Sequence, residues 1–437
     1  MTVDLMLRSA REAAYRMLDT VVVWLEVDVF DPLNRCFPQA DWKYVTLFAL
    51  LLFPFFEPVG LRHVISPVFG TIYLVMQVVA IAVIAALYVF RTPKDKFSLL
   101  AIAIVAFMLL TTAANERLGR LWIYTQWFYD WVPVAAAVLL TAYARYAGPG
   151  KIRELLWAVM LVTGLLSVVN LISIFLWPHL IDPGTRAMLN FYGHKNSSIY
   201  VALPSVGASL MLDALASRRC SMRSALLYLV AVLQCLVSYS ATSAATLFVL
   251  AALMVVVQFR RARPFVNGLS CLGACGVLSL LIMVGPVRRL FSPVIEGILG
   301  KSLTFTGRTF IWDSVLDLMA GKRLLVGYGS SIRFNIVAEG IPYSDPHSFF
   351  LYLWLSGGII GFILCAALLV LAMKALYRCR RDYPAAVLAV VVTCFLVIGL
   401  MESLITTAWP LFVALAYYRA SLEDKGSLKR ADRVVCP

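Results

Sequence analysis

The chain has 437 residues, of which 61% are hydrophobic and only 14% are charged, and its formal net charge is +14. Soluble domains carry roughly 25% charged residues, so this composition leaves too little polar surface for a protein that faces water on all sides. It excludes a soluble enzyme or binding module and predicts an all-α integral membrane protein, because helices satisfy their own backbone hydrogen bonds in lipid.

The first 41 residues differ from the rest of the chain. Acidic residues interrupt their apolar run, Thr20–Phe30, and Arg8, Arg11 and Arg16 fall along one side of a helical pattern. We interpret residues 1–41 as an amphipathic cytoplasmic segment at the inner membrane surface. It is not a signal peptide, because the apolar stretch begins late, contains acids and lacks a small-residue cleavage site.

Twelve apolar segments follow, each near the roughly 20 residues that a helix needs to cross a bilayer. They are residues 43–60, 66–90, 97–114, 128–147, 155–178, 198–216, 223–239, 242–259, 266–286, 347–374, 384–401 and 403–418. Nine of these predicted transmembrane helices lie within residues 42–286 and three lie within residues 347–418.

The placement of Lys and Arg predicts the orientation, because cytoplasmic loops retain basic residues. Of the 38 Lys and Arg residues, 26 fall at the two chain ends and in alternate loops. Twelve crossings with both termini in the cytoplasm put all these clusters on one side, including a basic tail over residues 419–437. The same placement explains most of the net charge, so no nucleic acid partner is predicted.

The nine Cys residues predict neither a disulfide framework nor a metal site. None lies in an outer loop of this topology, and Cys271 and Cys275 share one face of a predicted span, where small buried residues are ordinary. Asp313 and Asp317 are four residues apart, and we interpret them as a solvated helix face. They leave metal catalysis open, but no metal and no cofactor is predicted.

The longest segment outside the predicted spans is residues 287–346, on the outer side. Loops of such length are usually functional or partly helical. Apolar spacing over Thr309–Gly321 predicts a short amphipathic helix on the outer membrane surface. Arg308 precedes it, where unpaired backbone N–H groups and the helix dipole would help it to hold an anion. The alternative is an interfacial Arg that reaches lipid phosphates.

Two further features lie in or beside this loop. Gly327-Tyr328-Gly329 predicts a tight turn, since neither a strand nor a Lys-Ser/Thr pair makes it a nucleotide-binding loop. His347 lies where the loop meets the tenth span, partly desolvated and able to exchange a proton near neutral pH. A purely structural His is the alternative.

A second polar cluster enters the membrane between the fifth and sixth spans. It consists of Arg186 followed by Tyr192–Ser198, and on this topology it faces the same side as His347. The four His residues of the chain all fall at outer loops or span ends: His63, His179, His194 and His347. This convergence predicts a functional site on the outer side.

At these residues the sequence resembles the O-antigen ligase and polymerase superfamily of membrane glycosyltransferases. The resemblance rests on short motifs in a fixed order over residues 185–365, and the flanking spans match only in hydropathy. The motifs are Gly193-His194-Lys195-Asn196, Ser238–Ser243, Phe305–Thr309 with Ile311-Trp312, Gly327-Tyr328-Gly329, and His347-Ser348 with Leu351 and Gly357–Gly361.

The resemblance implies transfer of a glycan from an undecaprenyl-diphosphate carrier to a sugar hydroxyl on the outer face of the bacterial cytoplasmic membrane, without metal or nucleotide sugar. It implies that His347 is the general base and that Arg308 holds the diphosphate, because a guanidinium stays charged and gives bidentate hydrogen bonds. The implied substrate contacts are Arg186, His194, Lys195, Asn196, Gly307, Trp312, Gly327, Tyr328, Gly329 and Ser348.

The chain departs from the superfamily's pattern at two places. Many relatives carry Ser-Arg near the start of the span that here begins Ala241-Thr242, so one expected phosphate-binding Arg is missing. Many also have His-Asn where this chain has His347-Ser348. The Ser240–Ser243 and Gly193–Asn196 motifs resemble capsule or exopolysaccharide polymerases more than lipopolysaccharide ligases. The resemblance therefore favours a repeat-unit polymerase, with an O-antigen ligase as the alternative and a chain-length regulator or flippase as a partner.

A lipid-linked sugar or solute transporter is the alternative from another class. Such carriers usually need ionisable residues near the bilayer midplane or visible inverted repeats. The predicted spans are nearly free of charge at their centres, and the polar motifs gather at one rim. This distribution favours an enzyme.

Overall fold

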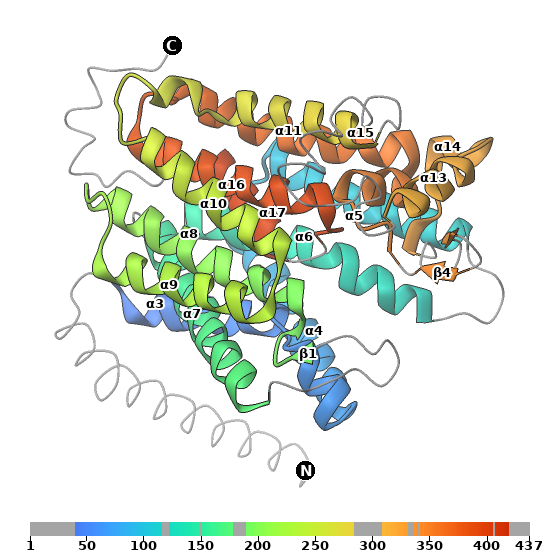
Figure 1. Cartoon of the computed structure of the whole chain (residues 1–437), viewed down its shortest axis with the longest axis horizontal. Coiled ribbons are helices and arrows are strands. Elements are labelled where there is room, and N and C mark those ends of the chain that lie inside the picture. The colour runs from blue at the N-terminus through green and yellow to red at the C-terminus, as the bar shows by residue number, and fades with distance from the viewer. Residues whose placement is uncertain are drawn as a thin grey trace, which may run out of the picture.

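The computed structural model describes residues 40–115, 122–148, 150–177, 189–283, 308–330, 336–338, 341–343, 345–404 and 407–418. Over these ranges the protein is an all-α membrane protein whose long apolar helices pack into one bundle (Figure 1). The predicted amphipathic segment lies outside the described residues except for its last two positions, and the predicted basic tail lies entirely outside them.

A helix coincides with each of the twelve predicted spans. These helices are α3 (Trp42–Leu52), α4 (Val68–Arg91), α5 (Lys96–Ala114), α6 (Trp122–Tyr146), α7 (Lys151–Leu176), α8 (Ile199–Leu215), α9 (Met222–Ser238), α10 (Ala241–Val256), α11 (Gly268–Met283), α15 (Phe349–Arg378), α16 (Tyr383–Met401) and α17 (Ala408–Tyr417). Within the described ranges, seven helices are long and apolar enough to cross a membrane: α4 to α7, Lys195–Leu215 containing α8, α15 and α16. The other five are shorter, so twelve crossings stay a prediction.

Helices α8 and α16 lie at the centre of the bundle. Every residue of α8 from Val201 to Ala214 is buried, and so is 83% of the most apolar stretch of α16. The two helices approach closely at Gly207, where a Cβ atom would come within 2.7 Å of Val391 Cγ1. Small residues allow this approach, and van der Waals packing then holds the helices together in lipid. Helix α4 is peripheral, with 28% of its span buried.

Part of the predicted outer loop, residues 287–346, is helical, as predicted. Helix α13 (Arg308–Leu318) covers most of the predicted helix, and α14 (Lys322–Val326) follows it. Strands β3 (Ile336–Ala338) and β4 (Ile341–Tyr343) then form an antiparallel hairpin. Figure 1 shows these elements together at one end of the bundle, beside α5 and α15.

Helix α15 is broken near its first third. Gly358 has φ 61° and ψ −162°, which no helix contains and which glycine adopts without a steric penalty. The turn after α14 packs into the break, where Tyr328 N–H donates to the Leu355 carbonyl at 2.9 Å. The predicted span 347–374 is thus two helical pieces, and the break anchors the outer segment to the bundle.

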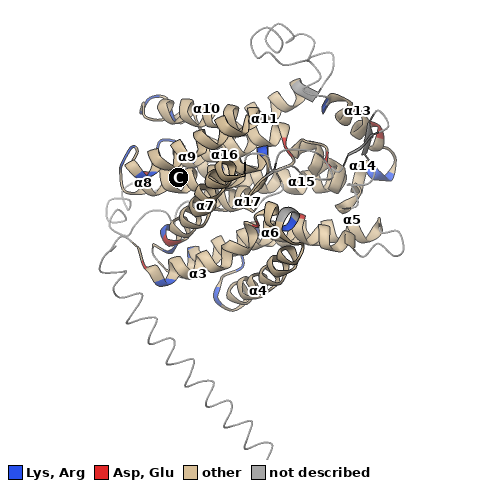
Figure 2. Ribbon diagram, turned by 60° about the horizontal axis from the view of Figure 1, so that its bottom comes forward, with Lys and Arg blue, Asp and Glu red and all other residues tan. Residues whose placement is uncertain are grey.

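Charged side chains lie mainly at helix ends and in connections, as Figure 2 shows, while the middles of the helices are largely uncharged. The predicted orientation can be tested on two exposed positions, Ala320 after α13 and Ser217 after α8. In a background without native Cys, an impermeant thiol reagent should label Ala320→Cys in intact cells and Ser217→Cys only after permeabilisation. The reverse labelling pattern would overturn the orientation.

Candidate active site

The candidate site is arranged around one carboxylate group, that of Glu402. Helix α16 ends at Met401, and the side chain of the next residue, Glu402, is only 10% exposed. Its Oε1 accepts hydrogen bonds from Arg308 Nη2 and Asn196 Nδ2, each at 2.8 Å. Its Oε2 lies 3.7 Å from His347 Nδ1, which is an ion-pair distance rather than a hydrogen bond. Glu402 is therefore the point at which three distant segments of the chain meet.

Arg308 is the first residue of α13, and its side chain is 19% exposed. Besides the ion pair with Glu402, its Nη1 donates to the Met401 carbonyl at the end of α16. Among the described residues, the remaining N–H groups of this guanidinium have no hydrogen-bond partner. The side chain is thus fixed on one side and keeps donors for an anion on the other.

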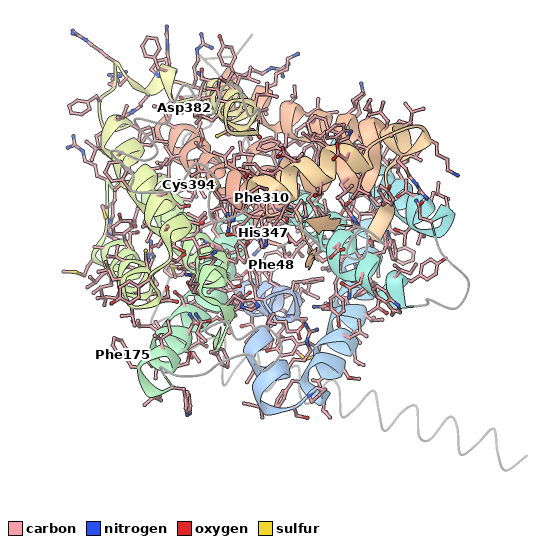
Figure 3. All side chains as sticks on the ribbon, turned by 45° about the vertical axis from the view of Figure 1, so that its right-hand side comes forward. Phe48, Phe175, Phe310, His347, Asp382 and Cys394 are labelled. Atoms are coloured by element: carbon pink, nitrogen blue, oxygen red, sulfur yellow. The ribbon has the colours of Figure 1, made fainter. Side chains whose placement is uncertain are left out.

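His347 lies directly before the N-cap of α15, and Figure 3 labels it near the middle of the bundle in that view. Its φ is 51°, a left-handed conformation that is uncommon outside glycine and marks functional sites when the surroundings hold it. Asp345 Oδ1 accepts the His347 backbone N–H at 2.5 Å and also accepts the Ser403 hydroxyl. This turn fixes the backbone and leaves the imidazole 37% exposed.

Burial and neighbouring charges shift the pKa of His347 in opposite directions, and the same is true of Glu402. Burial alone would lower the pKa of His347, but the carboxylates of Glu402 and Asp345 outweigh it and raise that pKa above its ordinary value. Burial alone would raise the pKa of Glu402, but His347 and Arg308 outweigh it and lower that pKa. Glu402 is therefore an anion that favours the protonated form of His347.

Asn196 joins this cluster to the start of α10. Its Nδ2 donates to Glu402, and its Oδ1 accepts from the Ser240 hydroxyl at 2.8 Å. Ser240 also caps α10 by accepting the Ser243 backbone N–H at 3.3 Å. Two of the motifs singled out in the sequence, Gly193–Asn196 and Ser238–Ser243, therefore meet through one hydrogen bond.

A buried amide network holds the segment that carries Asn196. Strands β1 (Leu189–Asn190) and β2 (Gly193–His194) form a short hairpin, and its Tyr192 N–H donates to Asn170 Oδ1 at 2.8 Å. Asn170 Nδ2 donates to Gln234 Oε1 at 2.7 Å, and Gln234 Nε2 donates to the Ser167 hydroxyl at 2.6 Å. These contacts tie the hairpin to α7 and α9, so the position of Asn196 is set from inside the bundle.

Two other predicted site residues are buried behind the cluster. Trp312 is 1% exposed, and its Nε1 donates to the Pro346 carbonyl at 3.0 Å, which ties α13 to the residue before His347. Ser348 is fully buried as the N-cap of α15, and its hydroxyl has no partner among the described side chains and backbone groups. Their geometry suits residues that position His347.

The predicted Gly327-Tyr328-Gly329 turn lies at the break in α15. Gly327 and Gly329 have φ of 68° and 62°, and a Cβ at Gly327 would meet the Ser356 carbonyl at 2.5 Å. Tyr328 Oη donates to the Leu318 carbonyl at 3.1 Å. These contacts make the turn an anchor between α14, α15 and α13.

The remaining predicted contacts lie beside Asn196 or outside the described residues. His194 and Lys195 are exposed beside Asn196. Arg186 and Gly307 lie outside the described residues. The structure thus brings together His347, Arg308 and Asn196 from the predicted set and adds Glu402, Asp345 and Ser240.

Glu402 was not among the predicted site residues, although its position in the sequence is unusual. It is the one acid between Asp382 and Glu423, and it separates the predicted spans 384–401 and 403–418. An acid at the rim of an apolar pair of helices is costly unless it is paired or functional. That rim lies on the same predicted side as His347.

A comparison with protein families finds one match, which covers part of the residues that form this cluster. Residues 225–366 match the family model described as O-Antigen ligase. This part of the chain, about a third of its length, is similar to the O-antigen ligase family. The match includes Arg308, His347 and Ser240 and ends within α15, so Glu402 and Asn196 lie outside it.

The match to the O-antigen ligase family model confirms the predicted resemblance to the superfamily and supports a ligase-like or polymerase-like multi-pass membrane enzyme. It favours an enzyme over the transporter alternative. A search of the curated proteins finds no match.

Proposed function

We propose that this enzyme transfers a glycan from an undecaprenyl-diphosphate carrier to a sugar hydroxyl at the cluster formed by Arg308, His347 and Glu402, on the outer face of the bacterial cytoplasmic membrane. One observation carries the proposal. Glu402 holds a guanidinium and an imidazole on the two oxygens of one carboxylate. These are the two groups that such a transfer needs, one for the leaving group and one for the proton.

In the proposed step, the acceptor hydroxyl oxygen attacks the anomeric carbon of the donor sugar. The proton of that hydroxyl passes to His347, and a new glycosidic bond forms. The two carboxylates beside Nδ1 favour a proton on that nitrogen, so Nε2 keeps the lone pair that accepts the hydroxyl proton. Glu402 and Asp345 therefore orient the base.

The bond between the anomeric carbon and the diphosphate oxygen breaks as the new bond forms, and its electron pair leaves on the diphosphate. Arg308 stabilises the negative charge that develops there with the N–H groups that no described residue pairs. The ion pair with Glu402 holds this guanidinium in place. The negative charge of Glu402 also repels the diphosphate product and so limits how tightly the product is bound.

The proposed role of Glu402 predicts a change in pH dependence. Glu402→Gln keeps an oxygen that accepts from Arg308 but removes the charge that raises the pKa of His347. That pKa should fall, so the neutral base persists to more acidic conditions and the acidic limb of the transfer rate moves to lower pH. A pH series on purified protein measures this, with Asp317→Asn, an exposed acid on α13, as the matched control. An unchanged or upward-shifted limb would remove Glu402 from this role.

We infer a polymerase from the motif resemblance, and the family description favours a ligase as the second candidate. Purified protein given only lipid-diphosphate-linked repeat units should produce a ladder of longer lipid-linked glycans, because donor and acceptor are then the same class of molecule. Mass measurement of the products checks this. Single transfer to an added acceptor of a different class, without a ladder, would replace the polymerase by a ligase. No new glycosidic bond with any acceptor would contradict the proposed function.

A further inference from the structure

Tyr200, in the first turn of α8, is a polar residue beside the Glu402 cluster that no motif predicted. It is the second residue of the helix and lies outside the matched residues 225–366. Its ring packs against the hydrophobic core, and the residue is only partly buried. Among the residues that the structure describes, its hydroxyl has no hydrogen-bond partner. A polar group in this state calls for an explanation, and a bound ligand is one.

The register of α8 against α16 places Tyr200 close to Glu402. Gly207 approaches Val391 near the middle of the two helices. Asn196 and Glu402, which share a hydrogen bond, are each eleven residues from that contact, so the two helices run antiparallel. Tyr200 is four residues from Asn196 in one continuous helical stretch, which is about one turn. Helical side chains lean toward the N-terminus of their helix, so the Tyr200 ring leans toward the level of Glu402.

The charges around Tyr200 agree with this placement. Tyr200 lies within electrostatic reach of Glu402, Asp345 and Arg308. Arg308 and Asn196 donate to the same oxygen of Glu402, Oε1, at 2.8 Å each. The guanidinium therefore lies beside Asn196, one turn from Tyr200. One ligand can contact both the Tyr200 hydroxyl and the N–H groups of Arg308 that no described residue pairs.

The two carboxylates of the cluster oppose the binding of an anion. Glu402 and Asp345 repel a diphosphate, and Arg308 already donates to Glu402 and to the Met401 carbonyl. A diphosphate at this site therefore needs hydrogen-bond donors besides the guanidinium. The phenol of Tyr200 supplies one and adds no positive charge that would pair with Glu402 instead.

We propose that Tyr200 is a second donor to the diphosphate leaving group, beside Arg308. This inference rests on the proposed function, because it takes the leaving group from that reaction. The Tyr200 hydroxyl donates a hydrogen bond to the diphosphate oxygen that receives the electron pair of the breaking bond. Its proton stays on the tyrosine oxygen, and His347 takes the acceptor proton as before. The hydrogen bond strengthens as negative charge develops, which makes Tyr200 a catalytic residue.

Tyr200→Phe tests the role because it removes one oxygen atom and keeps the ring that packs against the core. It should lower kcat for glycan transfer by about 10–100-fold, as expected for one hydrogen bond to a charged group. KM for the acceptor should change little, since the acceptor does not contact this hydroxyl. Tyr239→Phe is the matched control, because Tyr239 is 85% exposed directly before Ser240 and should match wild type when changed.

A series of donors separates a contact with the leaving group from a structural role. The donors carry the same glycan and lipid, and the oxygen between the two phosphorus atoms is kept, replaced by CF2 or replaced by CH2. The CH2 leaving group is the stronger base, so it depends more on donors that stabilise its charge. Tyr200→Phe should therefore lose more rate with the CH2 donor than with the CF2 donor. Unchanged kcat, or an equal loss with all three donors, would overturn the assignment.

A binding measurement separates this inference from the proposed reaction. Farnesyl diphosphate should bind Tyr200→Phe about tenfold more weakly than wild type, whereas farnesol should bind both equally. A loss confined to farnesyl diphosphate in a protein that transfers no glycan would keep Tyr200 as a diphosphate contact and reject the reaction. Glycan transfer by wild type, with equal farnesyl diphosphate affinity in the two proteins, would reject the role of Tyr200 and keep the reaction.

Discussion

Replacing His347 by glycine is expected to lower the rate of glycan transfer by about 10²–10⁴-fold, the usual contribution of one general acid–base group. Glycine is the informative substitution because residue 347 has a φ of 51°, which alanine adopts only with strain. His347→Gly thus removes the imidazole while keeping the backbone in its native turn. Initial rates of the purified variant, with its melting temperature beside wild type, measure the effect.

Chemical rescue distinguishes a lost base from a disturbed fold. Added imidazole should restore part of the rate of His347→Gly, because the variant leaves an opening beside Glu402 and Asp345. It should not restore a protein that has lost its packing. Transfer by His347→Gly within about threefold of wild type would show that another group takes the proton.

Arg308→Lys is expected to lower kcat by about 10²–10³-fold, the effect of losing one aligned donor to developing negative charge. Lysine keeps the positive charge but lacks the planar guanidinium group. That group donates hydrogen bonds to Glu402 and Met401 and, in the proposed reaction, to the diphosphate as well. Arg323→Lys on α14 is the matched control in the same outer segment, and it should stay within about threefold of wild type. Comparable losses in both variants would mean that arginine side chains of the outer segment matter in general, rather than the contact that Arg308 makes with the leaving group.

Removing the Arg308 charge also has a structural consequence that can be separated from catalysis. Arg308→Ala leaves the Glu402 carboxylate, 10% exposed, without its main cation, which costs roughly 1–3 kcal/mol of stability for an unsatisfied buried group. Arg308→Ala combined with Glu402→Gln removes that charge and should recover most of the melting temperature. The double variant should remain inactive, since the leaving group still lacks its guanidinium.

Much of the fold could be predicted from the sequence because lipid imposes a simple rule. Apolar runs of membrane length must be helical, and a helix coincides with every predicted span. The helix after Arg308 was predictable for a similar reason, since its apolar spacing and the following Gly321 indicate both its face and its end. Hydropathy could not predict the break in α15, because Gly358 adopts its conformation only where α14 packs against it.

The cluster itself was only partly predictable. His347, Arg308 and Asn196 belong to motifs that can be recognised one at a time, but the residue that joins them is separated from Arg308 by 94 positions and from Asn196 by 206. No local pattern encodes such a contact. Conversely, Trp312 and the Gly327–Gly329 turn were predicted to contact the substrate because they belong to motifs. In the structure their hydrogen bonds hold α13 and α15 in place.

The most direct test of catalysis at the Glu402 cluster follows both products of one reaction in the same sample. Purified protein would receive a lipid-diphosphate-linked glycan and an acceptor, and mass spectrometry would count released lipid diphosphate and new glycosidic bonds over time. Wild type should form the two in equal amounts, and His347→Gly and Arg308→Lys should lose both together. Equal formation of both products by the variants at the wild-type rate would contradict catalysis at the Glu402 cluster.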